Sequence, residues 1–121
     1  MGITAGILLV LMSVAHNLFG EMRQRPALER ITKDDVIIGS QRIMVFQGGF
    51  LLLAVGIIQI MVSADLIVLT GIARYFPIGI VFINFFTALI ITALFHRTIF
   101  RITIPQFAVF LLIMLLQYTS L

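Results

Sequence analysis

Four long apolar stretches, joined by short polar connections, make up most of this chain of 121 residues. The stretches cover residues 2–20, 43–64, 77–95 and 102–118. The first stretch would form an α-helix about 28 Å long, which is close to the thickness of the hydrocarbon core of a bilayer. The pattern therefore predicts an all-α integral membrane protein, a four-helix bundle whose single transmembrane domain spans residues 1–121.

The composition agrees with a lipid environment. Hydrophobic residues make up 61% of the chain and charged residues only 11%. A soluble domain of this size could not bury so much apolar surface, so the lipid bilayer is the first predicted partner of the helices. The absence of cysteine excludes disulfide bonds, iron–sulfur clusters and thiol catalysis.

Basic residues are distributed unevenly over the connections. Seven of the eight Lys and Arg residues lie in residues 21–42 and 96–101, and only Arg74 lies in the connection 65–76. Basic residues collect on the cytoplasmic side of membrane proteins, so we predict that 21–42 and 96–101 are cytoplasmic and that both termini lie outside the cell membrane. The net charge of +3 does not indicate a nucleic-acid partner, because no basic run is interleaved with aromatic residues.

Turn and capping residues refine the ends of the helices. The dipeptide 25–26, Arg-Pro, is predicted to break the chain. Residues 32–35 are typical of a helix start and predict a helix that runs on into the second span. The connection 65–76 is predicted to contain an interfacial helical turn. Pro77 is expected at the start of the third helix, and Pro105 in the first turn of the fourth.

Each span also carries a row of small or polar residues at helical spacing. The rows are Gly2, Gly6, Leu9, Ser13, His16/Asn17 and Gly20; Gly48, Leu52, Gly56, Gln59 and Ser63; Asn84, Thr87, Ala88, Thr92 and His96; and Gln106, Phe110, Ile113 and Gln117. Membrane helices pack through small residues and through polar side chains that bond across the interface. We therefore expect the rows to face one another and the Leu, Ile, Val and Phe side chains to face lipid.

Polar and ionisable residues inside a membrane are costly, which makes them functional candidates. The candidates for a ligand-binding or polar cluster are His16, Asn17, Glu21, Arg42, Gln47, Asn84, His96 and Gln106. By depth, Asn84 belongs with Gln59 and Gln117 near the outer face, and the others belong near the cytoplasmic face. No catalytic residue and no metal ligand is assigned.

Each candidate has a structural alternative. His16 is expected either to hydrogen-bond to a neighbouring helix, to take part in binding or proton transfer, or to ligate a metal. Glu21 is expected to pair at the membrane surface with Arg23, Arg25 or Arg42. Gln47 and Asn84 are typical of hydrogen-bonding residues between helices, and His96 is typical of an interfacial residue.

The segment 15–21, Ala-His-Asn-Leu-Phe-Gly-Glu, resembles the end of the first helix in a family of small bacterial four-helix membrane proteins. That helix ends in His-Ser-x-x-Gly-Glu, followed by a basic loop and a second span. The resemblance covers about the first half of this chain, implies the same architecture, and draws attention to His16 and Glu21. Asn17 replaces the usual Ser, and Gln47 with 48–49, Gly-Gly, stands where the family tends to place His and Trp. The family has no established biochemical function.

Three functions remain open from the sequence. The favoured hypothesis is a non-enzymatic subunit or binding module that packs with itself, as a homo-oligomer, or with a larger membrane complex. The alternatives are an oligomeric transporter or channel subunit, and a b-type haem or metal-binding redox protein that uses His16 and His96. The cofactor is otherwise unknown. Enzymatic catalysis is disfavoured, because His16 and Glu21 lie roughly 140° apart around one helix.

Overall fold

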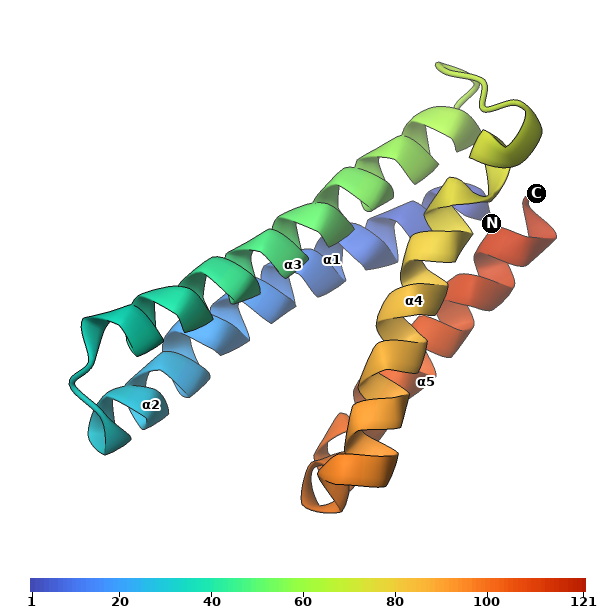
Figure 1. Ribbon diagram of the computed structural model, residues 1–121. Coiled ribbons are helices and arrows are strands. Elements are labelled where there is room, and N and C mark those ends of the chain that lie inside the picture. Colours follow the sequence, from blue (N-terminus) through green and yellow to red (C-terminus); the bar gives the residue numbers. More distant parts are fainter.

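The computed structural model covers residues 1–121 and consists of helices and short connections (Figure 1). The elements are α1 (Gly2–Phe19), a π-helical turn η1 (Gly20–Gln24), α2 (Arg25–Ile31), α3 (Asp35–Ser63), a 3-10 turn η2 (Gly71–Tyr75), α4 (Phe76–Ile90), a π-helical turn η3 (Ile91–Phe95) and α5 (Arg97–Thr119). They join into four continuous helices, each long and apolar enough to cross a membrane. The predicted all-α four-helix fold is confirmed.

The four helices form two antiparallel hairpins (Figure 1). The first hairpin pairs α1 with α3 along their lengths, and the second pairs α4 with α5. The hairpins meet near the two chain termini and diverge toward the ends that carry α2 and the α4–α5 turn. His16, one of the polar residues predicted near the cytoplasmic face, therefore lies in the half of the bundle where the hairpins separate.

Glycines set the close approach within the first hairpin. A Cβ atom on Gly6 would lie 2.8 Å from the carbonyl oxygen of Gly56, and a Cβ on Gly56 would lie 3.0 Å from the carbonyl oxygen of Gly6. Such distances leave no room for any side chain, so the two backbones are in direct contact. The predicted packing of small residues between the first and second spans is confirmed.

An apolar core joins the two hairpins in the half of the molecule nearer the termini. Its buried residues are Ala5, Leu9, Leu52, Val55, Val81, Phe85, Phe107, Phe110 and Ile113. Phe85 of α4 and Phe107 of α5 pack edge to face with ring centroids 5.4 Å apart. The outward side chains of all four helices, such as Leu11, Phe50, Phe82 and Leu115, are half exposed or more, as expected for helices surrounded by lipid.

The prediction that the chain breaks at 25–26 is wrong. The helix passes through Pro26 because η1 lies directly before it, where the N–H of Arg25 donates to the carbonyl of Gly20. The wider π-helical turn shifts the hydrogen-bond register at the point where the proline ring would strike the i−4 carbonyl. Only residues 32–34 separate the first two helices, and Asp34 caps α3 by accepting from the Val36 N–H at 3.0 Å. The predicted helix start is therefore confirmed.

Two other local predictions have opposite outcomes. Pro77 lies in the first turn of α4, as predicted. Pro105 does not lie in a first turn, because α5 begins at Arg97 and contains the proline in its interior. Interior prolines are tolerated in membrane helices where neighbouring groups re-satisfy the freed backbone. The 3-10 turn η2 provides the helical turn expected in the connection 65–76.

Candidate functional site

Two cavities open between the diverging hairpins and share three lining residues, His16, Leu52 and Gln106. One cavity, of about 330 Å³, lies between α1 and α5. The other, of about 340 Å³, is lined by residues of α1, α3, α4 and α5, with Asn84 and Thr87 among those of α4. We refer to the two cavities together as the crevice. The hydrophobic pattern of a helix indicates which of its residues face the bundle. That α1, α3 and α5 all reach the crevice follows instead from the divergence of the hairpins.

His16 connects the two helices of the first hairpin and also lines the crevice. Its Nε2 lies 3.1 Å from the carbonyl oxygen of Val45 on α3. A carbonyl oxygen only accepts, so Nε2 carries the hydrogen, and Nδ1 is an acceptor when the ring is uncharged. A Cβ on Gly48 would lie 3.3 Å from Nε2, so Gly48 allows the ring to lie against α3. The hydrogen bond to a neighbouring helix, one of the three roles expected for His16, is present.

Asn17, the next candidate, does not enter the crevice. Its side chain occupies the space over Gly49, where any Cβ would collide with its amide. Its Oδ1 is buried and has no hydrogen-bond partner within the chain. The pair Gly48 and Gly49 thus receives His16 and Asn17 from α1. Sequence reasoning noted these glycines, but not their role as the surface that accepts the two polar side chains.

Asn84 and Gln106 bring polar groups to the crevice from the second hairpin. The Nδ2 of Asn84 donates to the carbonyl of Ile80 at 2.9 Å, which leaves its Oδ1 as a free acceptor. The amide of Gln106 and the hydroxyl of Thr87 make no side-chain hydrogen bond within the chain. Placing Asn84 by depth with Gln59 and Gln117 was wrong, because it lines the same cavity as His16 and Gln106.

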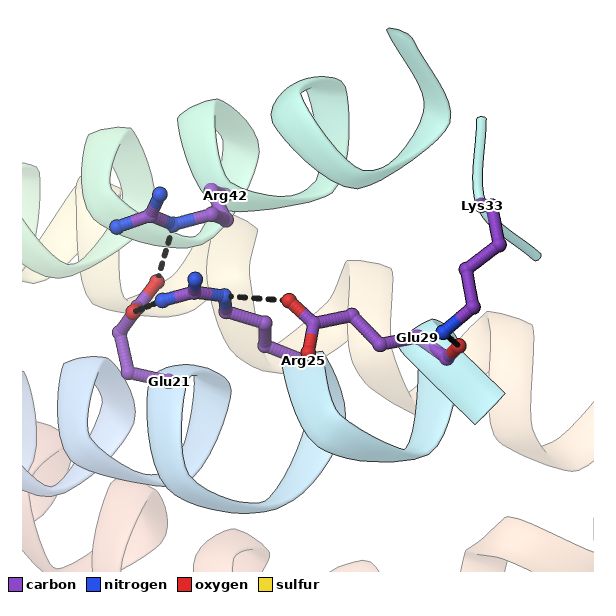
Figure 2. A network of polar contacts seen from close by, with 5 residues as sticks. All are labelled: Glu21, Arg25, Glu29, Lys33 and Arg42. Carbon is purple, nitrogen blue, oxygen red and sulfur yellow. Dashed lines mark hydrogen bonds and ion pairs between the residues drawn. The ribbon is translucent and has the colours of Figure 1, made fainter. Parts of the chain in front are cut away.

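Glu21 and Arg42 lie beyond the crevice, in a cluster of charged residues at the end of the first hairpin (Figure 2). Glu21 Oε1 pairs with Arg42 Nε at 2.8 Å, and Glu21 Oε2 pairs with Arg25 Nη1 at 2.9 Å. Arg25 also pairs with Glu29 at 3.0 Å. The hydrogen bond from Arg42, followed by that from Arg25, holds the pKa of Glu21 below its ordinary value, and the two carboxylates raise the pKa of Arg25. The cluster links η1 to α3.

Gln47 and His96 are not brought to the site. Gln47 is exposed on the outer face of α3, beside Phe46 and Phe50. His96 is exposed in the turn between η3 and α5 and lines neither cavity of the crevice. The structure therefore does not place His16 and His96 on one ligand, as a shared haem would require.

The row predicted on the third span is also only partly buried. Thr92 is buried, but Thr87 and His96 are exposed, and the packed face of α4 carries Val81 and Phe85 instead. The row on the last span is confirmed for Phe110, Ile113 and Gln117, which are buried, whereas Gln106 is only partly buried. The exposure of Thr87 is what places its hydroxyl at the crevice.

A second polar contact lies near the termini. Gln117 Nε2 donates to Gln59 Oε1 at 3.2 Å, and Gln59 Nε2 donates to Ser63 Oγ at 3.2 Å. Both glutamines line a cavity of about 360 Å³ that Arg74 also borders. Sequence reasoning placed the two glutamines at one depth without selecting them as site residues. Their common depth was the signal that could have identified them.

The crevice combines unbonded polar groups with apolar walls, and His16 is its one titratable side chain. This arrangement suits the binding of a molecule, because ligand sites are typically apolar clefts with a few converging polar groups. No protein-family model, curated protein or solved structure matches the chain. Its function has to be inferred from the crevice and the charged cluster themselves.

Proposed function

We propose that the chain is a multi-pass membrane protein that acts as a non-enzymatic binding module, with the crevice as its binding site. One observation carries the proposal. His16, Asn84, Thr87 and Gln106, from three helices, bring hydrogen-bonding groups that the chain leaves unbonded to one place among apolar spans. In hydrocarbon each unsatisfied polar group costs several kcal/mol, so such a group needs a partner from outside the chain.

The positions of the ionisable groups favour binding over catalysis. Acid–base catalysis needs at least two positioned titratable groups. Glu21, the nearest carboxylate to His16 on the same helix, is held by Arg42 and Arg25 in the charged cluster and does not line the crevice. His16 itself is held by the Val45 carbonyl. We assign both residues to holding α1 against α3, and His16 also to the wall of the site.

We also propose that the charged cluster lies on the cytoplasmic side and both termini outside. The support is the bias of basic residues, with seven of eight in 21–42 and 96–101. In this orientation the crevice opens between the hairpins in the cytoplasmic half of the bilayer. An occupant would then enter sideways from the lipid, where the hairpins diverge.

Site-specific photocrosslinking tests the binding function. A benzophenone amino acid replaces Ile83, an exposed apolar residue in the wall of the crevice, or, as the control, Ile57, which is exposed on α3 and does not line the crevice. After irradiation of native membranes we expect one discrete adduct from position 83 and a heterogeneous mixture of bulk lipids from position 57. The intact mass of the adduct tells a small molecule from a second copy or another membrane chain.

The same adduct profile from both positions would show that the crevice has no particular occupant. The proposal would then be wrong. A discrete adduct that is seen only from position 83 supports it, whatever the mass of the occupant.

A further inference from the structure

The hydrogen-bonding groups of the crevice define what kind of head group it can hold. Asn84 offers Oδ1 as an acceptor, and one of its two amide hydrogens is taken by the Ile80 carbonyl at 2.9 Å. His16 offers Nδ1, which accepts when the ring is uncharged, because Nε2 donates to the Val45 carbonyl. Both acceptors need a donor. Gln106 and Thr87 can donate or accept, so a group that does both, such as a hydroxyl, satisfies the set.

The electrostatics of the crevice disfavour a charged head group. No Lys, Arg, Asp or Glu side chain lines either cavity. The charges of the nearby cluster are already paired with one another, as Figure 2 shows. An anionic or cationic head group would therefore be taken out of water without a counter-charge, which is far more costly than burying a hydroxyl that finds hydrogen bonds.

The walls of the crevice suit a hydrocarbon chain. Met12 and Phe19 of α1, Leu52 of α3 and Val109 of α5 line one cavity, and Ile83 and Phe110 line the other. Cavities of about 330 and 340 Å³ lie in the range of small-molecule sites. A molecule with an apolar chain and a small polar head could enter from the bilayer and keep its chain in an apolar environment throughout.

On the basis of the proposed binding function, we propose that the crevice binds an uncharged membrane lipid through a free hydroxyl group. The hydroxyl donates to the acceptor at Asn84 or His16 and accepts from Gln106 or Thr87. The same chemistry is offered by a glycerolipid with a free hydroxyl and by a long-chain isoprenoid alcohol. The experiment below separates these two sources.

Native mass spectrometry of the full chain in detergent micelles measures the preference. The two neutral probes are dioleoylglycerol and a long-chain polyprenol, each compared with its own O-acetylated form. Acetylation keeps the apolar chains and replaces the hydroxyl by an acetyl ester, which can accept but not donate a hydrogen bond. Dioleoyl phosphatidic acid, with the same acyl chains and an anionic head, is the charge control.

We expect at least one neutral probe to bind about tenfold more tightly than its acetylated form, since a buried acceptor left without a donor loses roughly that factor. The same probe should also bind at least about tenfold more tightly than phosphatidic acid. Equal binding of the acetylated form, equal or tighter binding of phosphatidic acid, or failure of both neutral probes to bind would each overturn the proposal.

Variants locate the binding in the crevice. Gln106→Leu removes a polar group of the crevice, and Gln47→Leu makes the same change at an exposed position outside it. Thr87→Val is nearly isosteric at an exposed position, so it provides a second test if Gln106→Leu loses its helical circular dichroism. We expect Gln106→Leu and Thr87→Val to reduce the preference for the free hydroxyl and Gln47→Leu to retain it. The assignment of the binding to the crevice would be overturned if the preference were unchanged in Thr87→Val and, where that variant folds, in Gln106→Leu.

The two proposals fail in distinguishable ways. A discrete photo-adduct from position 83 without any preference for a hydroxyl would leave the binding module in place and refute the lipid class. The absence of a discrete adduct from position 83 would refute the binding function, and the lipid proposal with it.

Discussion

Glu21 is the residue at which the apolar part of the first helix gives way to its charged extension. Its two oxygens bond to different guanidinium groups, one on α3 and one on α2. Because Arg42 stabilises the ionised carboxylate in the folded chain, the pKa of Glu21 lies below its ordinary value of 4.5. The ionised form is therefore linked to the packing of α2 and η1 against α3.

This linkage predicts a pH dependence of stability with a definite sign. A group whose folded pKa is lowered contributes stability that is fully present above its unfolded pKa and is lost as the pH falls through the folded pKa. The melting temperature in detergent should therefore fall as the pH is lowered from about 5.5 to below the ordinary Glu value of 4.5. In Glu21→Gln that fall should be smaller, because one linked proton is missing, although the difference is modest for a pair at the surface.

The matched control is Asp65→Asn. Asp65 makes no ion pair and has a positive φ of 58°, a backbone conformation that Asn adopts readily. The control should keep the full pH dependence of the wild-type chain. A Glu21→Gln curve that parallels the wild type would show that the ion pairs of Glu21 do not link protonation to folding.

Single residues differ in how far the sequence predicts their contacts. Arg25 is four residues from Glu21 and so shares its helix face, whereas Arg23 is two residues away and does not. The pairing with Arg42 and the bond from His16 to the Val45 carbonyl depend on the axial register of α1 against α3. No local pattern defines that register, so three candidate partners of Glu21 stayed open until the helices were placed.

At the scale of elements, the first hairpin depends on the direct contact of two backbones. The carbonyl oxygens of Gly6 and Gly56 leave no space for a Cβ on the opposite helix. A backbone cannot swing aside as a side chain does, so relief requires α1 and α3 to separate. Separation would loosen van der Waals packing, which is the main attraction between helices in lipid.

The glycine contact predicts a large effect for a small substitution. Gly56→Ala should destabilise the chain by about 1–3 kcal/mol, the range for overpacking in a closely packed interior. Gly79→Ala in α4 is the control, because a Cβ there meets nothing within 4 Å. It should leave stability unchanged or raise it by up to about 1 kcal/mol, since Ala favours helix more than Gly. Unfolding of both variants in a series of denaturing detergent mixtures measures the difference, and equal effects at the two positions would contradict the close contact.

The elements also show where a pattern of small and polar residues fails. On α1 the row is clear, because Gly and Ser recur at helical spacing among large apolar residues. Gly2, Gly6 and Ser13 are buried as expected. On α4 almost every position is apolar, so several faces compete. The contact of Phe85 with Phe107 buries more area than Thr87 could, and it turns the polar face toward the crevice.

At the scale of the whole molecule, the two hairpins are held at one end and separate at the other (Figure 1). The apolar core near the termini joins them, while the crevice and the charged cluster occupy the diverging ends. The sequence predicts four helices and their hydrophobic exteriors from length and composition. It does not predict the divergence, because that angle depends on which core residues meet and not on any periodicity.

The placement of the ends relative to the membrane gives the last prediction. The chain has no cysteine, so single cysteines can be introduced without removing any. Ser40 in α3 and Thr98 in α5 are exposed at the two diverging ends, and Thr70 is exposed in the connection near the termini. Because basic residues mark the cytoplasmic side, a membrane-impermeant maleimide on intact cells should label Thr70→Cys and leave Ser40→Cys and Thr98→Cys unlabelled. The latter two should react only after the membrane is permeabilised, which also shows that they are accessible. Labelling of Ser40→Cys in intact cells would reverse the orientation and place the open side of the crevice in the outer half of the bilayer.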